Sequence, residues 1–415
     1  MAKPELFPAI SLCLVLLVGC ATTPMPSAPP TVPAPAQQQT EPASATPTPL
    51  LTATTPAAAP TPQEQKVSKP IAQQAAVVAT IERIRALPVD EAISVWDLIG
   101  APHLPWVALN TSEGVVLLSH RDGSLAGVLP WKETRAIAFG AAQPYLAVLT
   151  DEAVKVLTLN VQSAVPLLDA EVSLELPVSG ELVNLLGFSP RDTYLLLLED
   201  NTVRGYTLRN GKLAFEVALP VETGSRDPWV MTDDERLLLY APPQGNLLIV
   251  DVARSKLIGE IEFDPISALA ISPDGKQLAI AENRVAQNET YGEVLIPLRL
   301  GVWEMSILNE REVSLSLTAE LPFDAEFDGA NLPVTLEWLQ FYPGERPLLL
   351  GIAHWRGEGD TPSRMLLWEL SNNQQLARHK TESRILGHAL ADPSGTIATY
   401  QAGDGIALWS VKQSP

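Results

Sequence analysis

The sequence has few of the residues on which common active sites depend. It contains two cysteines and five histidines in 415 residues. Cys13 lies in an N-terminal apolar run with the features of a removed signal peptide, so the remaining chain keeps only Cys20. We therefore exclude a disulfide within the fold, a catalytic thiol and a cysteine metal site.

Basic residues are also scarce. The chain has 28 lysines and arginines against 48 acidic residues, which gives a formal net charge of −20. Residues 1–69 contain equal numbers of both signs, so the negative charge lies on the rest of the chain. Because phosphate contacts need positive charge, we expect no nucleic acid partner. Solubility beside an anionic surface explains the charge better than an acidic docking face, which stays open as the alternative.

Recognisable catalytic motifs are missing. The histidines are scattered and show no metal-ligand spacing; they are His103, His120, His354, His379 and His388. There is no Gly-x-Ser-x-Gly elbow and no phosphate-binding loop. We expect a protein that is not an enzyme. A hydrolase whose site is assembled from residues far apart in the sequence stays open as the enzymatic alternative.

The N-terminus has the features of a secretion signal. Residues 9–18 form an apolar run that is too short to span a bilayer and has the length of a signal-peptide core. The run ends in Leu17-Val18-Gly19-Cys20, which resembles the signal of bacterial lipoproteins. The resemblance implies that residues 1–19 are removed and that Cys20 is lipidated, with enough acyl chains for stable anchoring. An ordinary signal peptide with a chance cysteine is the alternative.

The resemblance also predicts a location in the cell. In a Gram-negative host, Ala21 after the lipidated cysteine implies the periplasmic face of the outer membrane. Residues 20–68 are rich in Pro, Thr and Ala and cannot bury a core, so we expect a disordered linker. Extended as polyproline II, it would reach on the order of 100 Å and hold the folded domain away from the membrane. A tail without a spacing role is the alternative.

The rest of the chain, residues 69–415, carries a repeat. Strand-like runs end in proline six times, at Pro88, Pro130, Pro177, Pro220, Pro265 and Pro322. Turn signals follow near Ala101, Ala141, Pro190, Asp233, Pro273, Pro343 and Pro393. Most of the spacings are 40 to 50 residues, with several short strands in each unit. This period is typical of a β-propeller.

Two series of turns define the blades. The run 268–281, with its Pro273-Asp274-Gly275 turn, resembles the first hairpin of WD40-type propellers. A second hairpin follows, as at Asp122-Gly123 and Asn210-Gly211. We predict an all-β fold, a seven-bladed propeller of four-stranded blades. The aromatic residues that end the third strands, Trp303, Trp368 and Trp409, should pack between blades. Trp96-Asp97 falls on a first strand, so its likeness to the WD dipeptide is a coincidence.

The last unit is one strand short. It runs from 386 to 411, and residues 75–87 before the first blade end in the same Leu-Pro as the other fourth strands. We expect residues 75–87 to pair with 405–411 and close the ring, which removes exposed sheet edges. A helix over residues 70–86 is the competing interpretation, because alanine and glutamine favour helices.

The spacing between the two turns of a unit is longer in the fifth and sixth units than in the others. The excess falls in residues 283–300 and 354–364, and a further long connection spans 322–333. In a four-stranded blade these connections emerge on one face, where loops on a rigid scaffold often carry function. The predicted binding face comprises Tyr291, Phe323, Phe327, His354, Trp355, Arg356 and Arg364. Loop growth without a partner is the alternative.

One of these connections resembles a calcium loop. Oxygen-bearing side chains occupy alternate positions before an Asn, at Asp324, Glu326, Asp328 and Asn331. The twelfth position holds Thr335 in place of Glu, which excludes a helix–loop–helix site. We favour a solvated acidic loop and expect no cofactor.

Together these features predict a monomeric lipoprotein of the bacterial cell envelope. The membrane contact is the lipid anchor alone, and the propeller is a protein-binding or scaffolding module. By analogy of fold, the partner belongs to an assembly or secretion complex. The alternative is a glycan-binding module in which Trp355 and Tyr291 stack on sugar.

Overall fold

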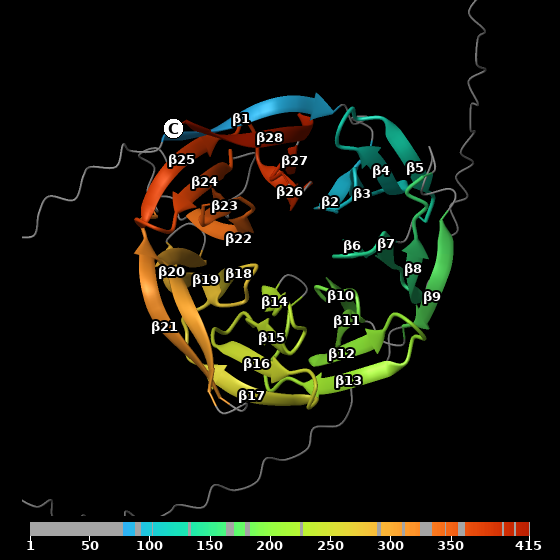
Figure 1. The fold of residues 1–415 in the computed structure, drawn as a ribbon, viewed down its shortest axis with the longest axis horizontal. Helices are drawn as coiled ribbons and strands as arrows, with labels where there is room; N and C mark the ends of the chain where they lie inside the picture. Colours follow the sequence, from blue (N-terminus) through green and yellow to red (C-terminus); the bar gives the residue numbers. More distant parts are fainter. Residues whose placement is uncertain are drawn as a thin grey trace, which may run out of the picture. The chain divides into compact units, whose positions relative to one another are not determined.

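The computed structural model describes a β-propeller. It covers residues 78–87, 93–101, 103–131, 134–162, 170–178, 183–224, 227–288, 292–308, 312–323, 334–344, 346–355, 362–391, 394–401 and 404–414. The chain divides into the units Met1–Lys69 and Pro70–Pro415, and the propeller occupies the second. Seven antiparallel sheets of four strands surround a central axis (Figure 1). Within the described ranges, no helix is long and apolar enough to cross a membrane.

Each blade runs from an innermost strand a to an outermost strand d. Blade 1 contains β2 (Val95–Gly100), β3 (Trp106–Thr111), β4 (Gly114–Ser119) and β5 (Leu125–Leu129). Blade 2 contains β6 (Ala136–Phe139), β7 (Tyr145–Leu149), β8 (Ala153–Thr158) and β9 (Glu171–Pro177). Blade 3 contains β10 (Val183–Phe188), β11 (Tyr194–Glu199), β12 (Thr202–Thr207) and β13 (Leu213–Ala218).

The other four blades follow the same order. Blade 4 contains β14 (Trp229–Met231), β15 (Leu237–Tyr240), β16 (Leu247–Asp251) and β17 (Lys256–Ile261). Blade 5 contains β18 (Ile266–Ile271), β19 (Gln277–Asn288), β20 (Gly292–Leu308) and β21 (Glu312–Leu321). Blade 6 contains β22 (Val334–Tyr342), β23 (Leu348–Trp355), β24 (Arg364–Glu369) and β25 (Gln374–Lys380). Blade 7 contains β26 (Ile385–Leu390), β27 (Ile397–Gln401), β28 (Gly405–Ser414) and, outermost, β1 (Val78–Leu87).

The sequence pattern of a strand follows its place in the blade. The middle strands β15 and β16 are apolar apart from Asp251 at the end of β16, and all of their residues are buried, because both of their faces pack against neighbouring blades. The outer strand β13 alternates buried and exposed residues along its second half, as a half-buried strand does. The core is therefore divided among the junctions between blades.

Aromatic residues pack at those junctions, as expected. Trp303 lies in the cluster between blades 4 and 5, Trp368 between blades 5 and 6, and Trp409 between blades 6 and 7. All three are buried. The indole N–H of Trp368 also donates to the carbonyl of Pro322 at 2.7 Å, so this side chain holds the end of the preceding blade.

Both ends of the propeller unit meet in blade 7. Residues 78–87 form a strand and no helix, and β1 pairs antiparallel with β28 from Val78↔Ser414 to Leu87↔Ile406. The two strands lie side by side at the rim, one blue and one red (Figure 1). The pairing closes the ring and gives blade 7 its fourth strand, so the outer edge of β28 is paired like that of the third strand in every other blade.

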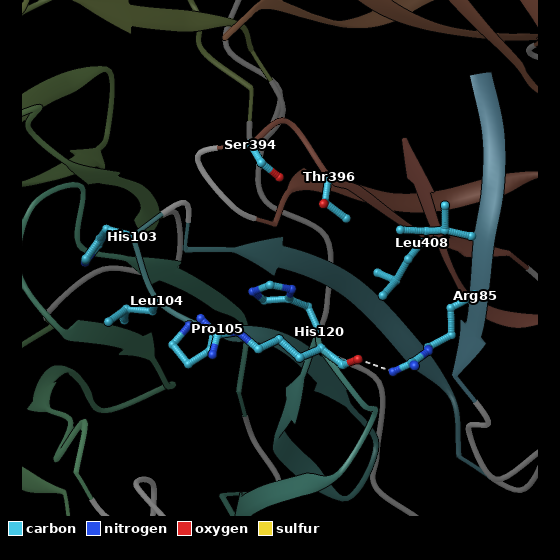
Figure 2. Close-up of a pocket in the computed structure, with 10 residues that line it drawn as sticks. Arg85, His103, Leu104, Pro105, His120, Ser394, Thr396 and Leu408 are labelled. Carbon is cyan, nitrogen blue, oxygen red and sulfur yellow. Dashed lines mark hydrogen bonds between the residues drawn. The ribbon is translucent and has the colours of Figure 1, made fainter. Parts of the chain in front are cut away.

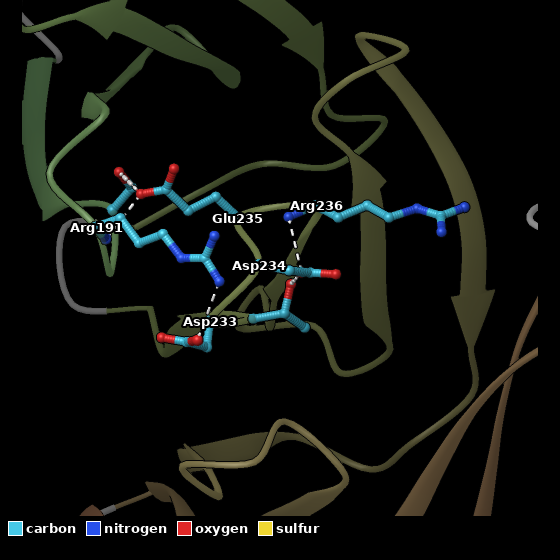
Figure 3. Close-up of polar contacts among 7 residues, drawn as sticks. Arg191, Asp233, Asp234, Glu235 and Arg236 are labelled. Carbon is cyan, nitrogen blue, oxygen red and sulfur yellow. Dashed lines mark hydrogen bonds and ion pairs between the residues drawn. The ribbon is translucent and has the colours of Figure 1, made fainter.

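Acidic side chains link the a–b turns of neighbouring blades. Glu235 in blade 4 accepts hydrogen bonds from the Ser189 hydroxyl at 2.6 Å and from the Arg191 backbone N–H at 2.8 Å, both in blade 3 (Figure 3). Asp192 in blade 3 accepts the N–H groups of Ala141 and Ala142 in blade 2, at 2.7 and 2.8 Å. We call these contacts the carboxylate clamps. They fix the turns on one face of the ring.

Candidate functional site

The innermost strands surround a cavity of 1280 Å³. Because neighbouring strands are antiparallel, every strand a begins on the face that carries the b–c and d–a connections; we call it the b–c face, and the opposite one the a–b face. Residues at these beginnings line the cavity, and we call them the channel mouth. They are Trp96, Asp97, Arg135, Asn184, Trp229, Ser267, Glu337, Arg384 and Leu386. Every blade contributes to this set.

Two large apolar side chains of the channel mouth are open to solvent. Trp96 is 51% exposed and Leu386 is 45% exposed. They begin the first strands of adjacent blades, and Trp229 adds a partly buried ring from blade 4. Scattered exposed apolar residues are ordinary on protein surfaces. Aromatic and apolar groups around one opening are typical of the centre of an interface.

The stretched b–c connection of blade 5 is a β-hairpin. The pairing of β19 with β20 continues past the blade, from Asn283↔Pro297 to Asn288↔Gly292. We call residues 283–300 the arm. Interpreting this segment as a loop was wrong, because its apolar residues pair across two strands, with Val285 opposite Leu295. Leu295 and its neighbours Glu293 and Val294 line the cavity, so the arm reaches the channel.

Polar side chains gather where blades 6 and 7 meet at the channel mouth. Oε1 of Glu337 lies 2.6 Å from Nε2 of His354, and a terminal nitrogen of Arg384 lies 3.2 Å from the same Nε2. One ring nitrogen cannot donate to the carboxylate and accept from the guanidinium together. The shorter contact assigns the proton to Nε2, with Glu337 as its acceptor. We call Thr335, Glu337, His354, Arg384 and His388 the polar cluster.

Two members of the polar cluster are buried. His354 is 4% exposed and Thr335 is fully buried. Within the described part of the chain, the Thr335 hydroxyl and Nδ1 of His354 have no hydrogen-bond partner. Buried polar atoms are nearly always paired in folded proteins, since leaving them unpaired costs about 1–3 kcal/mol each. Each such exception in a folded protein therefore needs a physical reason.

Two titrating groups of the channel have shifted pKa values. Burial lowers the pKa of His388 to about 4, against a smaller opposing effect of the Glu337 charge, and the His388 ring packs 4.9 Å from Trp338. Burial also raises the pKa of Asp227, although the Tyr240 hydroxyl donates a hydrogen bond to it. His388 is therefore neutral at pH 7.

Two residues of the predicted binding face lie on neighbouring strands of blade 6. His354 is the last residue but one of β23 and belongs to the polar cluster, whereas Arg364 begins β24 opposite Ala353 and so lies on the other face of the blade. Both are buried, so they support the surface and do not form it. Phe323 packs partly buried against the core between blades 5 and 6. Trp355 is the last residue of β23.

Other predicted positions lie outside the described residues. These are Cys20, Tyr291, Phe327 and Arg356, with the calcium-loop positions Asp324, Glu326, Asp328 and Asn331. In the ranges that the structure does cover, no group of three or more His, Cys, Asp or Glu side chains is arranged to hold a metal ion.

Sequence reasoning missed most of the channel mouth. The repeat places Trp96 on a strand a, and the beginning of that strand is where the cavity opens. Aligning blades 6 and 7 with blade 1 in the repeat would have placed Glu337 and Leu386 near the beginning of their own strands a.

Comparison with known proteins adds no assignment: no protein-family model matches this chain, and no curated protein matches it in sequence.

Proposed function

We propose that this chain is a lipid-anchored protein of the bacterial cell envelope whose propeller binds a protein partner at the channel mouth. The sequence Leu17–Cys20 supports the anchor. The propeller fold is consistent with a protein-binding module. The partner belongs to an assembly or secretion complex, in which a single copy of this chain acts as a scaffold beside the membrane.

The exposed pair Trp96 and Leu386 carries the proposal. Large apolar side chains on rigid strands make strong interface anchors, because little conformational entropy is lost when they are covered. The cavity of 1280 Å³ is larger than the range of about 300–1,000 Å³ that is usual for small ligands. A loop or extended segment of a protein fills such an opening. Its apolar side chain would pack between Trp96 and Leu386, beside the charges of Glu337 and Arg384.

Burial of His354 favours binding over catalysis. His354 is 4% exposed and is not among the residues that line the cavity, so its ring is withdrawn from a substrate in the channel. Its Nε2 is engaged by Glu337 at 2.6 Å. The pair instead holds the beginning of β22 against the end of β23, and this positions the rim of the channel mouth.

Affinity measurements on matched surface variants test the proposed site. The partner is first captured by crosslinking in intact envelopes, and its binding is then measured with Trp96→Ala and Leu125→Ala. Leu125 is 57% exposed on the outermost strand of blade 1, so it is the matched control. We expect Trp96→Ala to weaken binding by about thirtyfold, as for an interface anchor, and Leu125→Ala to leave it unchanged. Equal effects of the two variants would refute the site.

Two further results bear on the rest of the proposal. If Trp96→Ala abolishes retention on envelope glycan and leaves protein capture intact, the module is a lectin. The anchor predicts that Cys20→Ser loses palmitate labelling; continued labelling would exclude lipidation at this residue.

A further inference from the structure

A second pocket lies on the opposite face of the ring, where the closing blade meets blade 1. Its volume is 820 Å³. The walls come from β1, from the a–b and c–d turns of blade 1 and from the a–b turn of blade 7 (Figure 2). It belongs to the a–b face, so it is separate from the channel mouth. We call it the closure pocket.

The polar side chains of the closure pocket are basic groups and hydroxyls. They are Arg85, His103, His120, Arg121, Ser394 and Thr396. No carboxylate lines it among the described residues, although the chain carries 48 acidic against 28 basic residues. A concave site that gathers basic groups in an acidic protein creates a local positive potential. Such a potential selects an anion.

The two arginines of the closure pocket, Arg85 and Arg121, are not neutralised by an acidic side chain among the described residues. The guanidinium of Arg85 donates to the backbone carbonyl of Arg121, which is a neutral acceptor (Figure 2). Within the described ranges, neither Arg85 nor Arg121 forms an ion pair with an acidic side chain. The nearest acid in sequence, Asp122, accepts a hydrogen bond from the Ser124 hydroxyl at 2.8 Å inside its own turn. The two guanidiniums can therefore pair with an incoming anion.

The two histidines are held by their surroundings. Nε2 of His103 lies 3.0 Å from the backbone carbonyl of Gln143, and since a carbonyl only accepts, this nitrogen carries a proton. His120 is 8% exposed, and its ring points into the pocket between Leu104 and Thr396 (Figure 2). Leu104 and Leu408 supply an apolar wall beside these donors.

We propose that the closure pocket binds a phosphate ester. A phosphate group presents several acceptor oxygens to guanidinium, imidazole and hydroxyl donors, and Arg pairs with it in a bidentate manner. The apolar wall accommodates the carbon portion of the ester. Both a soluble metabolite and a lipid headgroup carry this chemistry. A bound ligand would contact both β1 and blade 1, so it would also stabilise the junction at which the ring closes.

A titration experiment tests the closure pocket. The full chain carrying Cys20→Ser is used, so that lipidation cannot bring it to membranes. Inorganic phosphate and glycerol 3-phosphate are titrated by calorimetry, and phosphatidylcholine vesicles with and without phosphatidic acid are tested by flotation. We expect glycerol 3-phosphate to bind more tightly than phosphate, and binding to weaken as salt is added. Binding to phosphatidic acid vesicles alone assigns the headgroup; binding to the soluble ester assigns a metabolite.

Arg121→Gln and its matched control decide the result. Arg209 precedes the Asn210-Gly211 turn of blade 3 as Arg121 precedes the Asp122-Gly123 turn of blade 1, and both are exposed. We expect Arg121→Gln to weaken binding at least about tenfold, the loss of one charge-assisted contact, with Arg209→Gln unchanged. Thermal unfolding of both variants should match the parent chain, and Arg85→Gln should repeat the loss from the other wall. Absence of binding in every arm, or equal losses for Arg121→Gln and Arg209→Gln, would overturn the proposal.

Discussion

The a–b turns of blades 2 to 4 and the channel mouth at blades 6 and 7 use polar groups in opposite ways. At the turns, the Asp192 and Glu235 carboxylates receive hydrogen bonds from the neighbouring blade. In the polar cluster, by contrast, Thr335 and His354 keep atoms that no described residue satisfies. The first region gains stability from its polar groups. The second leaves polar atoms without a partner among the described protein groups, at the place where the channel opens.

One turn position shows how the first region is built. Asp192 and Glu235 have φ angles of 55° and 58°, a left-handed conformation that costs about 1–2 kcal/mol for a residue with a side chain. Gly275 and Gly395 occupy the corresponding place in blades 5 and 7 without that cost. The strain is offset in blades 3 and 4 by the hydrogen bonds that the carboxylates accept. In blades 5 and 7 this position is glycine, so the backbone there is unstrained and the position carries no carboxylate.

The largest effect on stability should come from the core between blades 5 and 6. Trp368→Ala removes a fully buried side chain and leaves the Pro322 carbonyl without its donor. We expect a loss of about 3–5 kcal/mol in the free energy of unfolding, measured by denaturant titration. Trp96→Ala is the control and should cost under about 1 kcal/mol, because Trp96 is 51% exposed. Similar small losses for both would mean that blades 5 and 6 pack loosely.

The next effect depends on pH. The pKa of His388 is about 4 in the fold and about 6.5 in an unfolded chain, so the unfolded chain binds more protons between these values. Stability therefore falls as the pH drops from about 6.5 to about 4, by up to about 3 kcal/mol from this residue. His388→Gln should flatten that part of the stability profile relative to the parent chain. Parallel profiles for the two proteins would show that His388 is not desolvated.

The carboxylate clamp should have an intermediate effect. Glu235→Ala removes the acceptor of the Ser189 and Arg191 hydrogen bonds and keeps a left-handed backbone, for a loss of about 2 kcal/mol. Glu235→Gly removes the same acceptor but relaxes the backbone, so it should cost about 1 kcal/mol less. Urea unfolding of both variants measures the difference. If alanine and glycine cost the same, the strain at this turn has been misjudged.

The smallest effect on stability should come from the arm. Val285 is 54% exposed, and its pairing opposite Leu295 puts both side chains on one side of the hairpin. Val285→Ser should change the free energy of unfolding by less than about 0.5 kcal/mol. It should nevertheless weaken partner binding several-fold, as measured with the captured partner. Unchanged affinity would restrict the site to the seven innermost strands.

The sequence predicts the regular part of this fold well because the signals are local. Proline follows or ends several outer strands, such as Pro177 in β9 and Pro322 after β21, since a residue without an N–H interrupts pairing. Turns rich in Gly and Asn separate the strands at a steady spacing. These two signals are sufficient for the number of blades and the number of strands in each.

The channel mouth was not predictable in the same way. Trp96, Glu337 and Leu386 lie far apart in the sequence, and only ring closure brings them around one opening. The extra length of residues 283–300, relative to the other b–c connections, was visible in the sequence. That this segment forms a hairpin depends on the pairing of its two halves, which length alone does not predict. His354 and Arg364 were identified as site residues, yet their burial follows from blade packing that no local pattern records.

A crosslinking scan of both faces tests the central claim most directly. Photoreactive residues are placed one at a time at Trp96, Asn184 and Leu386 in the channel mouth, and at Arg209 and Lys276 in turns of the a–b face. In intact envelopes, we predict that one and the same protein is captured from the three channel-mouth positions and not from the two turns. Capture of that protein from the turns, with none from the channel mouth, would contradict the assignment of the binding site.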